Sequence, residues 1–340
     1  MRFIPVDEKK KAETLAFLAK YERTCVSLIE HVRRDESDIF SIESDARETL
    51  GVISVKSRML LCVPNARSLQ NDKAFCSSLK VFLSDKKISC VNGEAEASHL
   101  IMKIFAELGR TPLHINEYAL MTLSEAALKK IEAKDKRHTA LSKGQQTLIA
   151  RHTARAAGEK AYCEQFKIVR CGIKDADALM PLQLAYEAEE VLPPCRTQNP
   201  AVTRKNLERI LKTEYVLALQ NSRGETAAKA NTNAIGIRWA QIGGVYTAPD
   251  FRRKGCASLL VETLAEKIVA SKRLPVLYAR YGHSGGFIDG ERNTSKATVL
   301  MEYAGISFRS SVADLELHGN IRHKAPAAHR APEIAATHHG

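Results

Sequence analysis

Long hydrophobic runs are missing from this sequence of 340 residues. Apolar runs such as Met59–Val63 and Leu259–Val261 are far shorter than the roughly 18 residues that a membrane-spanning helix needs. The segment from Met1 to Lys11 has no apolar core of the length that a signal peptide carries. We therefore expect a cytoplasmic protein that does not associate with a membrane.

Closely paired cysteines are also missing. The chain has eight cysteines but no Cys-x-x-Cys pair, so the sequence predicts no metal site. No feature points to secretion, and a disulfide framework is therefore not expected. We expect most of the cysteines to be buried thiols. They are Cys25, Cys62, Cys76, Cys90, Cys163, Cys171, Cys195 and Cys256.

Acidic residues are outnumbered by basic ones, which gives the chain a net charge of +12. Half of this excess lies in residues 128–155, where eight Lys or Arg residues stand against Glu132 and Asp135, a net of +6. Such a stretch can bind nucleic acid, but no aromatic residue is interleaved with the charges, so the base stacking of single-strand binders is not predicted. A solvated connector between two domains is favoured, and a nucleic-acid-associated protein is the alternative.

Two units of similar element order are predicted, one on each side of this connector. In the first, a long amphipathic helix over 7–34 precedes three strands, a helix, a strand, a helix and a final extended segment. Their ranges are Ile39–Ile42, Gly51–Val55, Met59–Val63, Lys73–Leu83, Ile88–Val91, Glu96–Leu108 and Leu113–Leu123.

The second unit is predicted to hold a strand, two helices, three strands, a helix, a strand, a helix and a last strand. The shared order indicates a divergent internal duplication. The predicted ranges are Phe166–Cys171, Asp175–Val191, Thr203–Leu211, Tyr215–Leu219, Ala227–Trp239, Gly243–Thr247, Ala257–Ala270, Pro275–Arg280, Ser295–Ala304 and Phe308–Leu317.

The segment with the clearest chemistry runs from a strand through a basic loop into a helix. Pro249 has no N–H and turns the chain away from the sheet. Gly255 allows a positive φ or a close backbone approach at the turn. The loop places Arg252, Arg253 and Lys254 at the mouth of the helix. Because N–H groups and the dipole at a helix N-terminus favour an anion, this loop suits a pyrophosphate.

This segment resembles the central motif of the GNAT superfamily of N-acetyltransferases, Arg/Gln-x-x-Gly-x-Gly/Ala after a strand. It reads here Arg252-Arg253-Lys254-Gly255-Cys256-Ala257, preceded by Val-Tyr-Thr-x-Pro-x-x-Arg. The resemblance spans residues 166–317 and implies direct transfer of the acetyl group of acetyl-CoA to a primary amine. It also implies a set of cofactor-binding residues, which comprises Val245, Tyr246 and Thr247 for the pantetheine arm, Arg252, Arg253, Lys254, Gly255, Cys256 and Ala257 for the pyrophosphate, and Asn293 near the pantetheine.

The same resemblance bears on catalysis. A strand N–H, such as that of Val245, would polarise the thioester carbonyl. The residues from Asn293 to Gly305 resemble the family's Asn-x-x-Ala helix with one residue added. The tyrosine that commonly protonates the leaving thiolate in the family would fall on Met301 or Leu300, and neither side chain can donate a proton. A water, or unassisted departure of the thiolate, would have to substitute.

Three carboxylates end the predicted helix that borders the acceptor cleft in the family, namely Glu187, Glu189 and Glu190. A carboxylate there can attract a cationic amine and remove its proton. Glu189 or Glu190 is the candidate general base. A solvated helix end is the alternative interpretation.

The predicted fold is α/β (α+β), with a mixed, mostly antiparallel sheet flanked by helices in tandem GNAT-like domains. We expect a degenerate N-terminal domain over 1–125, because Val63–Arg67 echoes the motif without its glycine. A basic connector over 126–160, an acetyl-CoA-binding domain over 161–317 and a disordered tail over 318–340 complete the prediction. A catalytically weak acetyl-CoA-binding regulatory module is an alternative function. The acceptor, a small molecule or a protein, and the oligomeric state are left open.

Overall fold

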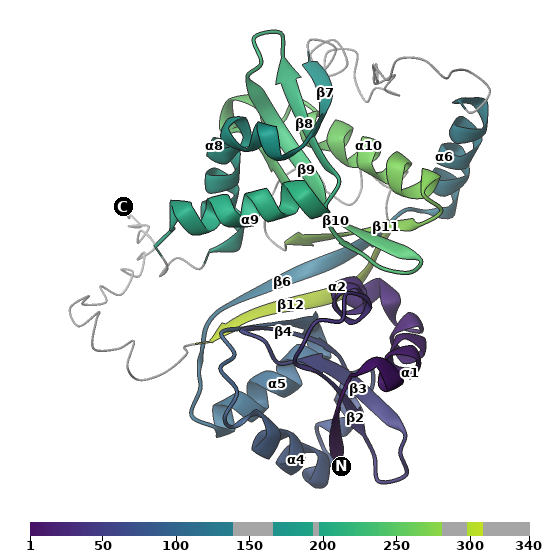
Figure 1. Cartoon of the computed structure of the whole chain (residues 1–340), viewed down its shortest axis with the longest axis vertical. Coiled ribbons are helices and arrows are strands. Elements are labelled where there is room, and N and C mark those ends of the chain that lie inside the picture. The colour runs from purple at the N-terminus through teal and green to yellow at the C-terminus, as the bar shows by residue number, and fades with distance from the viewer. Residues whose placement is uncertain (139–165, 193–196, 281–297, 309–340) are drawn as a thin grey trace, which may run out of the picture.

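The computed structural model describes residues 1–138, 166–192, 197–280 and 298–308. In these residues a mixed sheet of twelve strands runs through the molecule in the order β1-β2-β3-β4-β5-β12-β6-β11-β10-β9-β8-β7, with helices packed against it (Figure 1). Only the pairs β4–β5 and β10–β11 are parallel among the described pairings. The predicted mixed, mostly antiparallel sheet flanked by helices is confirmed.

The N-terminal half packs helices on both faces of its strands. Side chains alternate between the two faces of a strand, so Val52 packs with Leu28 of the first helices and Ile53 packs with Phe105 on the opposite face. The elements are β1 (Arg2–Pro5), α1 (Glu8–Ala19), α2 (Glu22–Arg33), β2 (Ile39–Glu43), β3 (Thr49–Ser54), β4 (Arg58–Cys62), α3 (Ala66–Leu69), α4 (Lys73–Leu83), β5 (Cys90–Glu94), α5 (Ala95–Glu107) and β6 (Pro112–Thr122).

The C-terminal half repeats this arrangement. Leu260 and Leu264 of its longest helix pack on Ala240 and Ile242 of the sheet. The elements are α6 (Glu125–His138), β7 (Phe166–Cys171), η1 (Ile173–Asp175), α8 (Ala176–Tyr186), the π-helical turn η2 (Glu187–Val191), α9 (Pro200–Thr213), β8 (Val216–Asn221), β9 (Thr226–Ile235), β10 (Trp239–Thr247), η3 (Pro249–Phe251), α10 (Cys256–Ala270), β11 (Leu274–Arg280) and β12 (Thr298–Phe308).

Helix α2 lies between the two halves, and its contact with the turn between β9 and β10 explains why one predicted strand boundary was wrong. A single strand was expected to reach Trp239, but the turn between β9 and β10 lies at residues 236–238. The Glu22 carboxylate of α2 accepts hydrogen bonds from the N–H groups of Ile237, Arg238 and Trp239, at 2.5, 2.8 and 3.1 Å. This tertiary contact stabilises the turn, and no local pattern reveals it. The helix predicted over 7–34 is likewise two helices, α1 and α2.

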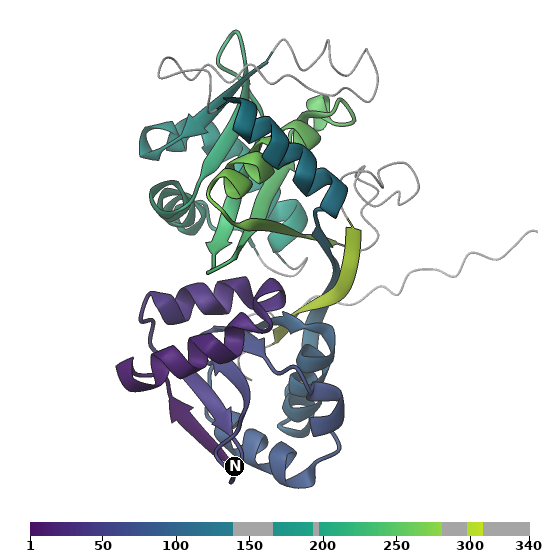
Figure 2. The same cartoon turned by 90° about the vertical axis from the view of Figure 1, so that its right-hand side faces the viewer.

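The halves exchange strands. Strand β12, from the end of the described chain, lies between β5 and β6, and β6 pairs in turn with β11 of the C-terminal half (Figure 2). The helix predicted over Ser295–Ala304 is therefore wrong for residues 298–304, which belong to β12. Without β12, β5 and β6 would each present an unpaired strand edge, a liability that proteins usually avoid. The conformation of β12 is therefore set by its pairing with two strands that are distant in the sequence, and the local sequence does not show this pairing.

Candidate functional site

Strand β10 carries a bulge at two glycines. Its register with β9 shifts between Gly243 and Tyr246, so Gly244 and Val245 have no partner on β9. Gly244 has a φ of +56°, and a Cβ there would lie 2.0 Å from Oδ1 of Asn231. Both the backbone conformation and the neighbouring side chain therefore favour glycine at this position.

Just before the bulge, β10 and β11 part. Their parallel register ends at Ile242 and Leu277, although both strands continue. The residues Val245–Thr247 consequently have no register partner on β11. A strand edge of this kind can accept an extended ligand. The residues predicted to bind the pantetheine arm, Val245, Tyr246 and Thr247, all lie on this stretch.

The loop after β10 delivers the N-terminus of α10 to the end of the strand. Arg253 and Gly255 have φ values of +61° and +79°, and α10 begins directly afterwards with Gly255, which has no side chain, at its N-cap. The N–H groups and the dipole at such a helix end favour an anion. The predicted pyrophosphate-binding residues all lie at this turn; they are Arg252, Arg253, Lys254, Gly255, Cys256 and Ala257.

The matching place in the N-terminal half is closed by a carboxylate. Asp72 caps α4, and its side chain accepts a hydrogen bond of 3.0 Å from the N–H of Phe75. A carboxylate at a helix N-terminus occupies an N–H group there, and its negative charge opposes a phosphate. The two halves therefore differ in their capacity to hold an anion at this position.

Glu189 connects η2 to the loop and to β10. One carboxylate oxygen accepts a 2.7 Å hydrogen bond from the Tyr246 hydroxyl, and the other accepts one of 2.7 Å from the Arg252 guanidinium. Arg252 also donates to the Thr247 carbonyl at 3.0 Å. Burial, followed by the hydrogen bond to Glu189, raises the pKa of Tyr246 to about 12. A predicted base and two predicted cofactor residues are thus brought together.

The other two carboxylates of this segment occupy different surroundings. Glu187 accepts hydrogen bonds from Gln183 of α8 and from Thr203 of α9. Burial is the largest cause that raises the pKa of Tyr186 to about 12, and the charge of Glu190 adds to it. The π-helical turn therefore distributes the carboxylates over two sides of the segment, with Glu189 facing the cofactor strand.

A buried lysine that the sequence interpretation missed lies beside the bulge. Lys229 of β9 is 2% exposed, and its Nζ donates a 2.9 Å hydrogen bond to the Gly244 carbonyl and lies 4.6 Å from the centre of the Tyr186 ring. Burial lowers the pKa of Lys229 to about 7, against the opposing effect of the Glu187 charge. The available signal was a single lysine among the alanines of residues 227–230.

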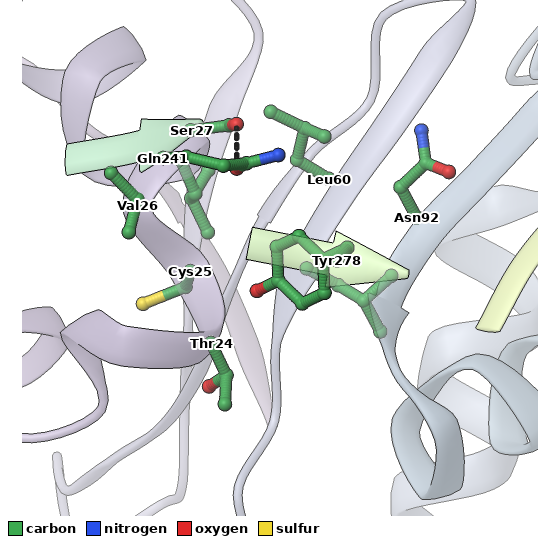
Figure 3. A pocket seen from close by; sticks show the side chains of 10 residues that line it. Thr24, Cys25, Val26, Ser27, Leu60, Asn92, Gln241 and Tyr278 are labelled. Carbon is green, nitrogen blue, oxygen red and sulfur yellow. Dashed lines mark hydrogen bonds between the residues drawn. The ribbon is translucent and has the colours of Figure 1, made fainter. Parts of the chain in front are cut away.

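A small pocket lies between the halves, where α2 meets β4, β5, β10 and β11 (Figure 3). Ser27 donates a 3.3 Å hydrogen bond to Oε1 of Gln241 across it, and the Tyr278 hydroxyl donates to the Arg23 carbonyl at 3.4 Å. Its volume of about 20 Å³ holds roughly one water molecule. The pocket joins the halves through polar contacts and is too small for an amine substrate.

The described residues do not place the remaining predicted residues at this site. Asn293 lies outside the described residues. Leu300 and Met301 belong to β12 and not to the helix that the resemblance implied for them. Within the described ranges no three His, Cys, Asp or Glu side chains gather as a metal site, and no helix of those ranges is long and apolar enough to span a membrane.

Comparison with known proteins bears on the fold of this chain. The family model of FR47-like proteins matches residues 221–284, which include the bulge, the loop and α10. None of the curated proteins matches the chain. A solved Drosophila protein is similar at 11% identity, with coverage of 91% of this chain and 98% of that one and a TM-score of 0.58.

Two further solved structures align over most of the chain. A tandem GNAT protein from the clavulanic acid biosynthesis pathway has 11% identity, coverage of 90% and 97%, and a TM-score of 0.48. A GCN5-related N-acetyltransferase from Sphaerobacter thermophilus has 13% identity, coverage of 87% and 92%, and a TM-score of 0.48. With the FR47-like match and the repeated element order of its two halves, the chain has a GNAT fold in tandem, as the C-terminal motif and the order of predicted elements together indicated.

Proposed function

We propose that the C-terminal half binds acetyl-CoA and transfers its acetyl group directly to a primary amine. One observation carries the proposal: the diverging edge of β10 leads straight into a helix N-terminus whose N-cap residue is a glycine, Gly255. The pantetheine arm of acetyl-CoA, which ends in a pyrophosphate, fits this arrangement. The strand edge suits the extended arm, and the helix N-terminus suits the anion.

The roles of the residues follow from their places. The pantetheine arm would lie along Val245–Thr247, with the thioester carbonyl held by the Val245 N–H. The turn at Arg252–Ala257 would hold the pyrophosphate, with Arg252 positioned to exchange its bond to Glu189 for a bond to phosphate. Arginine suits this exchange because its planar guanidinium binds both carboxylates and phosphates.

The chemistry is acyl transfer from sulfur to nitrogen. The amine nitrogen attacks the thioester carbon, a C–N bond forms, and the C–S bond breaks to release the CoA thiolate, which takes a proton from water. A base first removes a proton from the ammonium form of the acceptor, and we assign this step to Glu189 or Glu190. The main contribution of the protein is to hold the two reactants in the reactive geometry.

The N-terminal half has another part in this proposal. Asp72 opposes an anion at its helix N-terminus, so we infer that this half binds no acetyl-CoA. Helix α2 instead supports the β9–β10 turn, and strands β6 and β12 complete the sheet beside β11. A role in nucleic-acid binding is less favoured, since α6, the described part of the basic stretch, packs against α10.

Release of free thiol from acetyl-CoA tests the proposal. The protein is incubated with small amines, amino acids and lysine-containing peptides, and the rate is compared with that of Glu189→Gln and Glu190→Gln. The substitution that removes the base is expected to lower kcat by roughly 100-fold, and the other serves as its control. Binding of acetyl-CoA without thiol release from any amine would favour the regulatory-module alternative.

A further inference from the structure

The hydrogen bond from Lys229 to the Gly244 carbonyl has a geometric consequence for the acetyl-CoA site proposed above. The Gly244 carbonyl and the Val245 N–H belong to one peptide group, and the structure contains no cis peptide bond among the described residues. In a planar trans peptide group the C=O and the N–H point in opposite directions. Because Lys229 holds the carbonyl on its own side, the N–H of Val245 points away from Lys229.

This peptide group needs an external support. Neither Gly244 nor Val245 has a register partner on β9, and the register with β11 has already ended at Ile242. Glycine adds conformational freedom of its own. The ladder bonds that fix an ordinary strand peptide are therefore replaced here by a side chain.

We propose that Lys229 is a positioning residue, which fixes the Gly244–Val245 peptide group so that the Val245 N–H donates to the carbonyl oxygen of the acetyl-CoA thioester. The inference rests on the proposed function, because it assumes that the thioester lies at the parted edge of β10. Lys229 itself touches no reacting atom. It acts through the peptide group, and a cationic donor on the carbonyl also polarises the N–H at the other end.

The burial of Lys229 supports a role beyond packing. No carboxylate of the described residues forms an ion pair with this nearly buried ammonium, and its one hydrogen bond is to Gly244. An apolar side chain of similar length would fill the same space without the desolvation cost of an amine. The hydrogen bond from Nζ to the Gly244 carbonyl accounts for a lysine at this buried position.

The charge of Lys229 is expected to change near neutral pH. Three titratable groups face Lys229: Tyr186 from α8, Glu187 from η2 and Tyr246 from β10. Tyr246 is the register partner of Lys229 on β10, and its register partner on β8 is the uncharged Ala218. Both tyrosines have a pKa of about 12 and stay neutral in this range. As the pH rises through about 7, Lys229 loses its proton and its bond to the carbonyl loses the assistance of the charge.

Calorimetry with acetyl-CoA and with CoA separates this role from packing. CoA shares the pyrophosphate and pantetheine but lacks the thioester carbonyl. Lys229→Met is expected to weaken acetyl-CoA binding about tenfold and to change CoA binding by less than about twofold, which corresponds to the loss of one hydrogen bond. Lys212→Met, an exposed position on α9, controls for the change of side chain.

The outcomes distinguish this inference from the proposed function. If Lys229→Met keeps the wild-type ratio of acetyl-CoA to CoA affinity, the positioning role is wrong. If the wild type binds neither ligand, the proposed function is wrong and the inference falls with it. Should Lys229→Met fail to fold, the wild-type ratio is measured from about pH 6 to 7.5, below the ionisation of the CoA thiol. The ratio is expected to fall as the pH rises, and a constant ratio would overturn the inference.

Discussion

The carboxylate of Glu189 and the guanidinium of Arg252 lie 2.7 Å apart, and each side chain is 42% exposed. The pair joins the π-helical turn, which carries the candidate bases, to the loop that is suited to a pyrophosphate. An ion pair as exposed as this one contributes about 1 kcal/mol or less to stability. Its importance is therefore expected to lie in ligand binding and not in folding.

Arg252→Gln tests whether Arg252 contributes to ligand binding and not to folding. The free energy of unfolding should change by less than about 1 kcal/mol, while the Kd for acetyl-CoA should rise roughly tenfold because one charged contact to phosphate is lost. Denaturant unfolding and calorimetry measure the two quantities on the same preparation. A large loss of stability with unchanged affinity would assign Arg252 to the fold alone.

Gly244→Ala is expected to destabilise the protein by about 1–3 kcal/mol, because the residue has a positive φ and its new Cβ would meet Asn231. Gly109→Ala is the matched control: Gly109 has a φ of +74°, yet a Cβ there meets no atom within 4 Å. The difference between the two variants in thermal unfolding isolates the clash at the bulge. Equal effects would mean that the bulge can move aside.

The contact of Glu22 with the β9–β10 turn predicts a graded effect on stability. Glu22→Ala leaves three N–H groups without their acceptor in a site where Glu22 is 2% exposed, and should cost about 3 kcal/mol or more. Glu22→Gln should cost less, because all three bonds go to Oε1, while the buried Oε2 has no partner. If urea unfolding shows the reverse order, the negative charge and not the acceptor geometry stabilises this turn.

Strand β12 makes the two halves dependent on each other. Ala304 pairs with Gly93 on one side and Glu117 on the other, so Ala304→Pro removes an N–H from the middle of the sheet and should sharply reduce the soluble, folded fraction. Ala304→Ser keeps the N–H and is the control. Equal behaviour of the two variants in gel filtration and circular dichroism would contradict the pairing of β12.

The loop and its motif were predictable because their signals are local. The loop is formed by contiguous residues, namely three basic residues, Gly255 and the first residues of the apolar face of α10. Each of these features has one clear physical role at a strand-to-helix turn. The tandem arrangement was also predictable, since the order of elements repeats along the chain.

The features that escaped prediction depend on residues far apart in the sequence. Strand β12 satisfies the edges of β5 and β6, which lie about 200 residues earlier in the chain, whereas its own residues suggested a helix. The sequence around Lys229 does not indicate a special role, because the bulge at Gly244 that brings a carbonyl to its Nζ appears only in the structure. The turn stabilised by Glu22 likewise depends on a contact between residues more than 200 positions apart.

Binding of acetyl-CoA at the N-terminus of α10 is the central claim, and Gly255→Glu tests it most directly. Gly224→Glu is the matched control, because Gly224 has the same φ of +79° and a Cβ there meets no atom within 4 Å. By calorimetry, the wild type and Gly224→Glu should bind acetyl-CoA, while Gly255→Glu should bind about 100-fold more weakly, since its carboxylate would oppose the pyrophosphate. Equal affinity of all three proteins, or no binding by the wild type, would contradict the account.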